Sequence, residues 1–434
     1  MPDLKPFQRA GAQFLAARTR ALLADEPGVG KTAQVVAACD LVGARRVRVV
    51  CPAVGVTHWR REFDKWSVTP RRLEVLGYEQ ARSIYTRGEA ISPVDVFVPD
   101  ECHFAKNVGA ARAKAIYGKD GFGWHAGRIW ALSGTPAPNH AGELWPMLAA
   151  FGKTKMTHGD FVNYFCRVDG LGKIRGTRAD HISELRAILN EFTLRRKKAD
   201  VLPELGAIDI QEWHVDPRDD YVSLLINGPA LDGSDAKARA AEGLEQLEAQ
   251  IAGQSGDELA RTLEQMRGRR DDSLAMLRQV NAMRKTPAVY EQVMFEIENG
   301  LTDKVVIYAY HRVPMQLLRR MFNDAGVGAE LIYGETPQRK RDHFIQRWKR
   351  PSGPKVMLAS IIAAGVVLDF TEAHQGIMLE MDWVPGNNVQ AMQRMHRHGQ
   401  TRPVTVRVAM ADGIDERINT VLANKARELA AIFD

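Results

Sequence analysis

The sequence predicts an α/β protein with two parallel-sheet units, and three observations lead to this prediction. Short apolar runs rich in β-branched residues alternate with helical segments in the first hundred residues, as in VRVVCPA (47–53) and VDVFV (94–98). The alternation returns after residue 300, where DKVVIYAY, GAELIYG, KVMLAS and QGIMLEM are separated by helical stretches. The segment between these two regions is charged and helical. Continuous apolar strands interleaved with helices are typical of parallel sheets covered on both faces.

These regions give the expected domain order. We expect a first lobe over residues 1–195, a linker and helical protrusion over 196–300, and a second lobe over 301–434. In the protrusion, the breaker GQSG separates two apolar faces, formed by Leu244, Leu247 and Ile251 and by Leu259, Leu263 and Met266. This pattern favours an antiparallel helical hairpin. A free coiled-coil dimer is the alternative, but the heptads are too few, and we expect a monomer.

Composition narrows the class of protein. At 434 residues the chain is too long for one ordinary core and suits two domains with an appendage. Its formal net charge of +6 and pI near 9.1 are compatible with a polyanionic partner. The four cysteines are scattered without a C-x-x-C pair, which argues against a zinc site or a disulfide framework. The amino terminus lacks a leader pattern and no apolar run approaches a membrane span, so we expect a cytoplasmic protein.

The stretch DEPGVGKT (25–32) predicts a phosphate-binding loop before a helix. Gly28 and Gly30 allow backbone N–H groups to curl round phosphates. Lys31 can neutralise phosphate oxygens and the Thr32 hydroxyl can ligate Mg²⁺. The strict G-x-x-x-x-G-K-[ST] pattern has glycine where this chain has Asp25. The stretch therefore indicates ATP and Mg²⁺ as cofactors.

An acidic pair follows the apolar run VDVFV. Asp100 suits Mg²⁺ binding, and Glu101 suits orienting or deprotonating the attacking water. Pro99 removes a backbone donor, so we expect the strand to end or bulge there. Cys102 has no obvious base partner and is interpreted as a packing residue. Together with the phosphate loop, the pair predicts a nucleotide hydrolase.

The stretch QAMQRMHRHGQ (390–400) crowds arginines and histidines onto an expected helix. Two histidines suggest a metal, but helical spacing directs His396 and His398 about 200° apart. Gln390, Arg394 and Arg397 share one face at i, i+4 and i+7, which favours an anion. A basic helix face is most often solvated or in contact with nucleic acid.

The phosphate loop suggests a different anion for this face. A γ-phosphate bound with Mg²⁺ requires positive charge in the transition state, and Arg394 and Arg397 can supply it as arginine fingers. Because they lie in the second α/β unit, we expect hydrolysis to depend on closure of a cleft between the two lobes.

Whole motifs of the chain resemble the Snf2 (Swi2/Snf2-like) family of superfamily 2 ATPases along nearly its full length. LKPFQ resembles the Q motif, ADEPGVGKT motif I, CPAVGVTHW motif Ia, DECHFAKN motif II and LSGTPAPNHAGELWPML motif III. LRRKKADVLPEL resembles the segment joining the lobes, and QAMQRMHRHGQ resembles motif VI. SIIAAGVVLDFTEA resembles motif V less closely, because Val367 and Asp369 replace an expected glycine and Asn or Thr. LKPFQRAG and EMDWVPGNNVQA are most similar to the annealing-helicase branch and its compact bacterial or phage relatives.

The resemblance implies two RecA-like lobes, ATP hydrolysis with Mg²⁺, and duplex or branched DNA as the partner. It implies that Gln8 reads adenine, that Gln390 contributes to nucleotide binding, and that Ser133 and Thr135 link hydrolysis to DNA. The DNA-contacting residues by analogy are Thr57, His58, Asn139, Tyr310, His311 and Ser360. Trp59, which also lies in motif Ia, fits packing better than base stacking because it lies at helical spacing from Trp66.

Three interpretations of function remain. The leading one is a DNA-stimulated ATPase that translocates on double-stranded or branched DNA by ATP-driven closure of the lobes, with remodelling, annealing or protein displacement as its outcome. The second is a strand-separating DNA or RNA helicase of the same superfamily. The third is a DNA-binding module without turnover, which the intact Lys31, Glu101 and Arg397 disfavour. Phosphate contacts should dominate DNA binding in the leading case.

Overall fold

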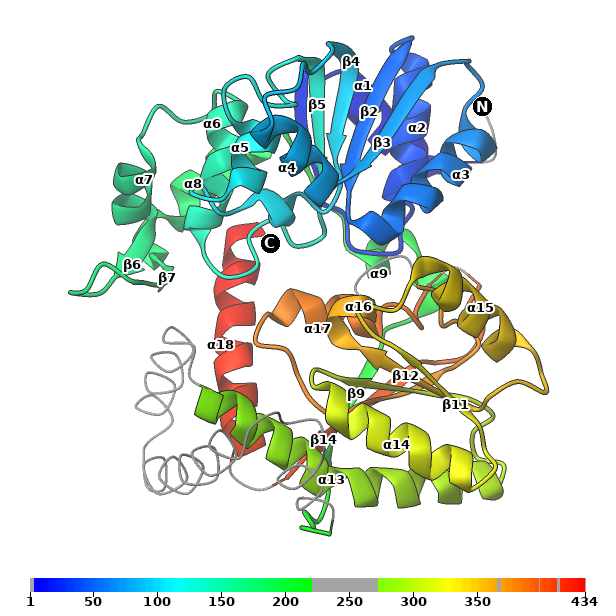
Figure 1. Cartoon of the computed structure of the whole chain (residues 1–434). Coiled ribbons are helices and arrows are strands. Elements are labelled where there is room, and N and C mark those ends of the chain that lie inside the picture. The colour runs from blue at the N-terminus through cyan, green and yellow to red at the C-terminus, as the bar shows by residue number, and fades with distance from the viewer. Residues whose placement is uncertain (1–3, 221–271, 365–367, 398, 412–413, 434) are drawn as a thin grey trace. The chain divides into compact units, whose positions relative to one another are not determined.

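The computed structural model describes residues 4–220, 272–364, 368–397, 399–411 and 414–433. It divides into two compact units (Figure 1). The first comprises Met1–Gly206 with Lys425–Asp434, and the second comprises Ala207–Asn424. Each unit contains a six-stranded parallel sheet with helices, which confirms the predicted α/β class.

The sheet of the first unit has the strand order β3-β2-β4-β5-β1-β8, and all its strand pairs are parallel. The strands are β1 (Arg20–Leu23), β2 (Arg46–Cys51), β3 (Arg72–Gly77), β4 (Val94–Pro99), β5 (Ala126–Leu132) and β8 (Thr193–Leu194). The apolar runs predicted as strands correspond to β2 and β4. β4 ends at Pro99, as its missing backbone donor predicts.

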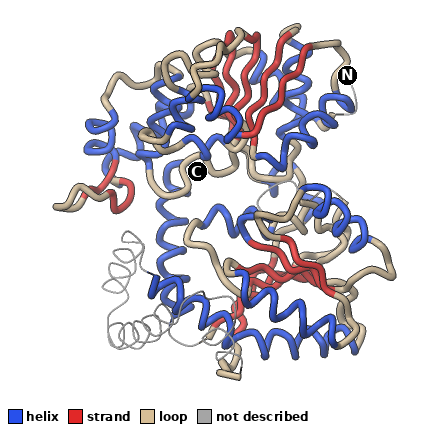
Figure 2. The backbone as a smooth tube through the Cα atoms, viewed as in Figure 1, coloured by secondary structure: helices blue, strands red, loops and turns tan. Residues whose placement is uncertain are grey.

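Helices cover both faces of this sheet (Figure 2). One core lies under α1 (Pro6–Ala16), α2 (Lys31–Leu41) and α3 (Val56–Trp66). The core of the other face includes residues of α4 (Tyr78–Thr86), α5 (Ala111–Tyr117), α6 (Trp145–Ala150), α7 (His158–Phe165) and α8 (Ile182–Asn190). A small hairpin of β6 (Cys166–Val168) and β7 (Ile174–Thr177), the short helix α9 (Lys198–Val201) and five 3₁₀ turns complete the unit. The central strands are therefore buried on both faces, which explains their continuous apolar sequences.

The sheet of the second unit has the order β11-β12-β10-β13-β14-β9, again with parallel pairs. Its strands are β9 (Asp209–His214), β10 (Val305–Ala309), β11 (Ala329–Ile332), β12 (Val356–Ser360), β13 (Gln375–Met378) and β14 (Thr405–Met410). On one face pack α13 (Asp272–Glu298) and α14 (Arg312–Asp324). On the other face lie residues of α15 (Gln338–Lys349), α16 (Ile361–Ala364) and α17 (Pro385–Met392). The long helix α18 (Ile414–Phe433) is divided between the units, with residues 414–424 in this one and residues 425–433 in the first.

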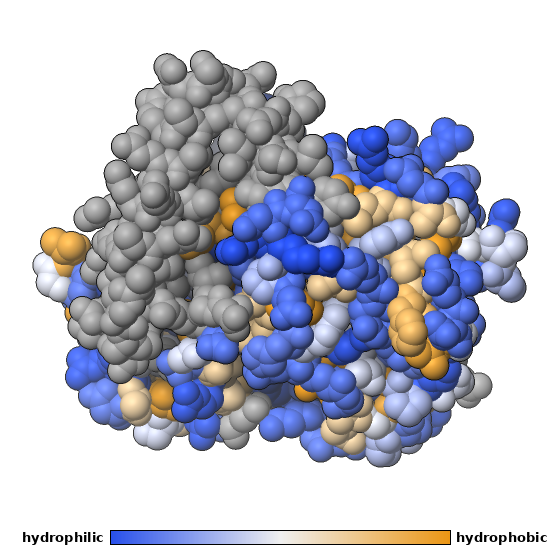
Figure 3. All heavy atoms as spheres, turned by 90° about the horizontal axis from the view of Figure 1, so that it is seen from below, coloured by the Kyte–Doolittle hydropathy of each residue, from blue (hydrophilic) through white to orange (hydrophobic). Residues whose placement is uncertain are grey.

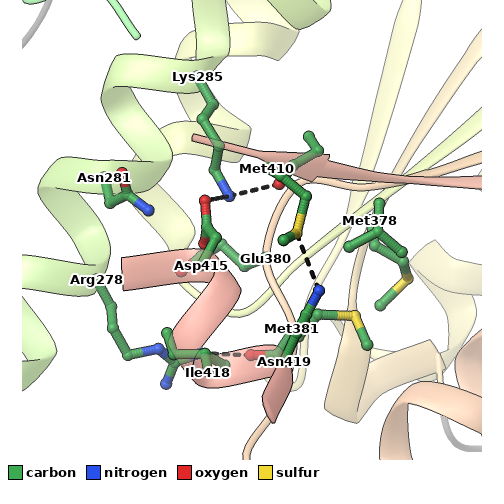
Figure 4. A pocket seen from close by; sticks show the side chains of 12 residues that line it. Arg278, Asn281, Lys285, Met378, Glu380, Met381, Met410, Asp415, Ile418 and Asn419 are labelled. Carbon is green, nitrogen blue, oxygen red and sulfur yellow. Dashed lines mark hydrogen bonds and ion pairs between the residues drawn. The ribbon is translucent and has the colours of Figure 1, made fainter. Parts of the chain in front are cut away.

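The structure differs from the predicted boundaries of the middle segment. β9 and α13 were expected in the linker and protrusion, but β9 pairs with β14 along six residues and α13 contributes Val289, Val293 and Ile297 to the core. Lys285 of α13 is almost fully buried and forms an ion pair with Asp415 at 2.9 Å and a hydrogen bond to the Ala409 carbonyl (Figure 4). A buried ammonium requires such partners, so α13 is an integral helix of the second unit. The predicted hairpin itself falls largely on residues 221–271, outside the described residues.

The surface shown in Figure 3 is mostly hydrophilic in its described part, with small hydrophobic areas between the polar ones. Among the described residues, none of the helices combines the length and the apolar run that crossing a bilayer requires.

Candidate functional site

The predicted phosphate loop joins β1 to α2, at the carboxyl edge of the first sheet. Gly28 and Gly30 have positive φ angles of 89° and 79°, which favour glycine. A Cβ on Gly30 would lie 2.4 Å from Nε2 of Gln8, so the loop and α1 approach too closely for a side chain. Gln8 donates to the Val29 carbonyl at 3.2 Å. The predicted adenine-reading residue is thus held against the loop.

Lys31 and Thr32 begin α2, immediately after the loop. The Lys31 ammonium donates to the backbone carbonyls of Asp25, at 2.6 Å, and Glu26, at 3.3 Å. These are ordinary neutral acceptors, so a phosphate oxygen would be a stronger partner for the ammonium. The helix amino terminus adds unpaired N–H groups that suit an anion.

Asp100 and Glu101 follow β4 at the same edge of the sheet. Burial first, and then the neighbouring Glu101, raise the pKa of Asp100 to about 6, although the Trp59 hydrogen bond and the Lys31 ammonium both lower it. Glu101 has φ 50° and ψ 55°, a left-handed conformation that only one other non-glycine residue of the described chain, Asp120, approaches. Such backbone strain often accompanies a functional position.

Residues of motif III are hydrogen-bonded to the acidic pair. Ser133, which follows β5, donates from Oγ to Oε2 of Glu101 at 3.5 Å and lies 3.0 Å from Nδ1 of His103. The backbone N–H of Thr135 donates to the same Ser133 Oγ at 3.1 Å. Burial lowers the pKa of His103 to about 3, so its ring is neutral at pH 7 and interacts with Glu101 as a dipole rather than an ion. The structure therefore brings Glu101, His103, Ser133 and Thr135 into one hydrogen-bonded group.

Trp59 is fully buried, in agreement with the packing interpretation, but it also has a polar role. Its Nε1–H donates to Oδ2 of Asp100 at 2.8 Å. The Tyr78 hydroxyl donates to the Asp100 carbonyl at 2.8 Å. The first contact orients the Asp100 carboxylate, and the second fixes its backbone.

Replacing Trp59 by Phe keeps most of the packing and removes this donor. We expect the Mg²⁺ concentration for half-maximal ATP turnover to rise about tenfold, because such supporting hydrogen bonds commonly contribute that much to metal affinity. Trp66→Phe is the matched control, since Trp66 lies on the same helix and its Nε1–H donates to Glu62 instead. Equal Mg²⁺ requirements in both variants would show that the Trp59 bond has no such role.

The expectation of one continuous helix over residues 390–400 is wrong. α17 ends at Met392, and the N–H groups of Arg394 and Met395 bond to carbonyls three residues back rather than four. The angular spacing of an α-helix therefore does not apply to Arg394 and Arg397. His398 lies outside the described residues.

These residues are nevertheless not part of a solvated basic surface. Gln390 and Arg394 are only 4% and 6% exposed. Burial lowers the pKa of Arg397, with opposing effects from Asp369 and Tyr308. Gln390 Nε2 and Arg397 Nε are buried without a hydrogen-bond partner among the described residues. Buried polar atoms normally have partners, so these two indicate a ligand or another contact.

The residues expected to contact DNA follow sheet strands in both units. In the first unit, Thr57 is exposed near the start of α3, and Asn139 is bound through its side-chain amide and backbone N–H to Glu143. In the second unit, Tyr310 is 39% exposed and His311 bonds to Glu380 at 2.6 Å. These two follow β10, whose last residue pairs with Ser360 of β12, so the three lie at one sheet edge.

The remaining candidates differ in exposure. His58 is half-buried and has interactions of its own, and Ser360 is only 8% exposed. Cys102 is buried, and burial raises the pKa of its thiol well above the usual range, in agreement with a packing role. All four cysteines are buried.

Sequence reasoning missed two residues of the site, His103 and Arg196, and the polar contact of a third, Trp59. His103 could have been found from its place two residues after Glu101. Trp59 was named, but its bond to Asp100 has no signal in sequence spacing. Arg196, which binds the loop residue Asp25, lies 171 residues away from it.

Comparison with known proteins links this geometry to a family. The model for the SNF2-related domain matches residues 7–98 and 75–214, and the model for the helicase conserved C-terminal domain matches residues 285–399. The SWI/SNF-related matrix-associated actin-dependent regulator of chromatin subfamily A-like protein 1 of Xenopus tropicalis is 27% identical over 435 residues, covering 95% of this chain and 43% of that protein. The DNA annealing helicase and endonuclease ZRANB3 of Mus musculus is 26% identical, covering 98% of this chain and 40% of that protein.

The chain thus spans about two fifths of the length of these relatives. Among solved structures, the Sulfolobus solfataricus SWI2/SNF2 ATPase core in complex with dsDNA is similar at 21% identity and a TM-score of 0.41, covering 98% of this chain and 92% of that one.

Proposed function

Because the chain belongs to the Snf2 family of superfamily 2 ATPases, whose enzyme class is ATP hydrolysis, we propose that it translocates on double-stranded or branched DNA. The observation that carries this proposal is the meeting of three motifs at the carboxyl edge of the first sheet. The loop of Lys31, the acidic pair Asp100 and Glu101, and the Ser133 hydroxyl converge there. Ligands of open parallel sheets bind at this edge.

The residues at this edge fit ATP with Mg²⁺. The glycine loop and the amino terminus of α2 offer backbone donors to phosphates, and Lys31 offers a positive charge. Within the described ranges, no group of three or more His, Cys, Asp or Glu side chains forms a metal site. Mg²⁺ in nucleotide enzymes needs few protein ligands, because phosphates and water complete its shell. We propose Thr32 and Asp100 as those ligands.

We propose the following roles in hydrolysis. Mg²⁺ would neutralise charge on the β- and γ-phosphates. Glu101 orients the attacking water and accepts its proton. Its carboxylate is held near Ser133 and His103, and because the His103 ring is neutral, it does not offset the negative charge of the carboxylate. Gln8 contacts adenine beside the loop. Gln390, Arg394 and Arg397 bind the nucleotide from the second unit, and the orphaned atoms Gln390 Nε2 and Arg397 Nε support this assignment.

Ser133 and Thr135 are proposed to link hydrolysis to DNA. The Ser133 hydroxyl accepts from the Thr135 N–H and donates to Glu101. Asn139 follows four residues after Thr135 and is proposed as a DNA contact. A shift of this segment on DNA binding would therefore alter the hydrogen bonding of Glu101. Thr57, His58, Tyr310, His311 and Ser360 are the other proposed contacts.

The test is the ATP turnover of the protein with equal phosphate concentrations of duplex, forked and single-stranded DNA. We expect duplex and forked DNA to stimulate turnover, and single-stranded DNA of the same length to stimulate it weakly. Stimulation by single-stranded DNA or RNA alone would favour the strand-separating helicase, and turnover indifferent to nucleic acid would contradict both.

A salt titration tests whether the protein binds DNA mainly through the phosphate backbone. If phosphates supply most of the binding energy, affinity for two duplexes of unrelated sequence should fall equally and steeply with salt. A flat salt response, or a strong preference for one sequence, would contradict backbone recognition.

A further inference from the structure

Asp25 departs from the strict phosphate-loop pattern, and its surroundings explain the departure. Its side chain is 0% exposed. Nε of Arg196 donates to Oδ1 of Asp25 at 3.0 Å, and Nη2 of the same arginine donates to Oδ2. A buried carboxylate is costly unless it is paired and hydrogen-bonded. A two-pronged arginine contact is the strongest arrangement that proteins use for this purpose.

The same guanidinium contacts two further elements beside the loop. Nη2 donates to Oε1 of Gln34 on α2 at 2.7 Å, and Nη1 donates to the Phe7 carbonyl on α1. Gln34 in turn donates to Oδ2 of Asp25 at 3.2 Å. A Cβ on Gly11 would lie 1.8 Å from Gln34 Oε1 and 2.9 Å from Arg196 Nη2. α1, the phosphate loop and α2 therefore pack closely around the Arg196 side chain.

The backbone of residues 194–198, which include Arg196, runs alongside the phosphate loop and is hydrogen-bonded to it. The N–H of Ala24 donates to the Leu194 carbonyl at 2.7 Å, and the N–H of Glu26 donates to the Arg196 carbonyl at 3.2 Å. The Lys198 N–H donates to Oε2 of Glu26 at 2.8 Å. The segment continues from β8 toward the chain that enters the second unit.

We propose that Arg196 and Asp25 position the phosphate loop for nucleotide, and that through them the segment leaving the first unit is held in register with the loop. In this proposal Arg196 is a positioning residue rather than a ligand of phosphate or adenine. It fixes the elements that carry Gln8, Lys31 and Thr32. Asp25 stands where the strict pattern has glycine because it is the loop's attachment point for the arginine. The inference rests on the proposed function, since it takes ATP as the ligand of the loop.

The experiment compares Arg196→Lys, Asp25→Asn and Asp25→Gly with wild type. Arg196→Lys keeps the positive charge and loses the two-pronged guanidinium contact, whereas Asp25→Gly restores the strict phosphate-loop pattern. The readouts are KM for ATP, kcat, and affinity for a fluorescent ATP analogue, all below the melting temperature of each variant. We expect KM and the analogue's dissociation constant to rise about tenfold or more in all three, because small displacements of a binding loop carry penalties of this size. kcat at saturating ATP should change less.

Arg18→Lys is the matched control. Arg18 also donates to a backbone carbonyl, that of Phe14, and its guanidinium lies over the Phe14 ring, but it is not bound to the loop. The Asp25→Asn/Arg196→Lys double variant should be little worse than the poorer single variant, because the two residues form one contact. Lower melting temperatures with unchanged KM and analogue affinity would overturn the inference, as would wild-type affinity in Asp25→Gly.

Failure of the proposed function gives a different result. If Lys31→Ala binds the analogue as well as wild type does, the loop is not the nucleotide site. If Lys31→Ala loses binding while Asp25→Asn and Arg196→Lys retain it, only the positioning role is wrong.

Discussion

Glu101→Gln should leave ATP binding intact and reduce turnover by about 10²- to 10⁴-fold, the contribution typical of a positioned general base. Glutamine keeps the shape of the side chain and can still bond to Ser133, but it cannot accept a proton. Glu101 is held in a left-handed backbone conformation, with its carboxylate 3.5 Å from Ser133 Oγ and 3.4 Å from His103 Nδ1. Turnover at saturating ATP and duplex DNA, measured beside affinity for a fluorescent ATP analogue, tests the expectation.

Lys31→Ala is the comparison that separates catalysis from binding. It removes the charge expected on the phosphates, so it should weaken the affinity for the analogue as well as turnover. Retention of near-normal DNA-stimulated turnover in Glu101→Gln would show that another group accepts the proton. Loss of analogue binding in that variant would show that Glu101 acts on binding rather than on chemistry.

The nucleotide motifs of the first unit were predictable because each is contiguous. Gly28, Gly30 and Lys31 follow one strand, and Asp100 and Glu101 follow another, so strand position alone places them at one sheet edge. The pairing of Asp25 with Arg196 was not predictable, because it joins residues far apart in the sequence through a strand of only two residues, β8. The glycine pattern signalled an irregularity at Asp25, but it did not indicate the partner.

The fold shows the same limit. Continuous apolar runs identified β2 and β4 of the first sheet and β10, β11, β12 and β13 of the second, but not β1, β5 or β14. β9 was missed because it is an edge strand with mostly exposed side chains, DIQEWH, which lacks the apolar signature. α13 was assigned to a protrusion because its sequence is charged, yet Lys285 and Arg278 are buried with acceptors (Figure 4). Charge indicates exposure only where no partner is available inside the protein.

The helix expected over residues 390–400 is shorter than its sequence pattern indicated. Helical spacing linked Gln390, Arg394 and Arg397, but the helix ends at Met392. Gln400 then donates to the carbonyls of Thr371, Ala373 and Met395, which fixes the turn after the helix. Tertiary contacts of this kind override local periodicity and leave no periodic signal in the sequence.

Arg394→Ala and Arg397→Ala should each reduce turnover by about 10³- to 10⁵-fold while leaving ATP affinity nearly intact, because an arginine finger acts mainly on charge that develops in the transition state. DNA affinity should change little. Turnover at saturating DNA and ATP, with nucleotide and DNA affinities measured for each variant, tests this expectation. Arg402→Ala is the matched control, since Arg402 is a more exposed arginine of the same unit that bonds to the Glu372 carbonyl.

The competing interpretation makes this segment a patch for DNA phosphates. In that case the same substitutions should lower DNA affinity and reduce the salt slope by about one each, with turnover at saturating DNA preserved. Burial argues against it: Arg394 is 6% exposed and burial lowers the pKa of Arg397, whereas side chains that track a phosphate backbone need to reach the surface. Because Arg394 is buried and Arg397 is half-buried, their removal can also destabilise the second unit, and melting temperatures separate that effect from chemistry. A variant that folds like wild type, binds the ATP analogue and fails to turn over would assign the arginine to the transition state, whereas one that turns over normally at saturating DNA would assign it to the DNA.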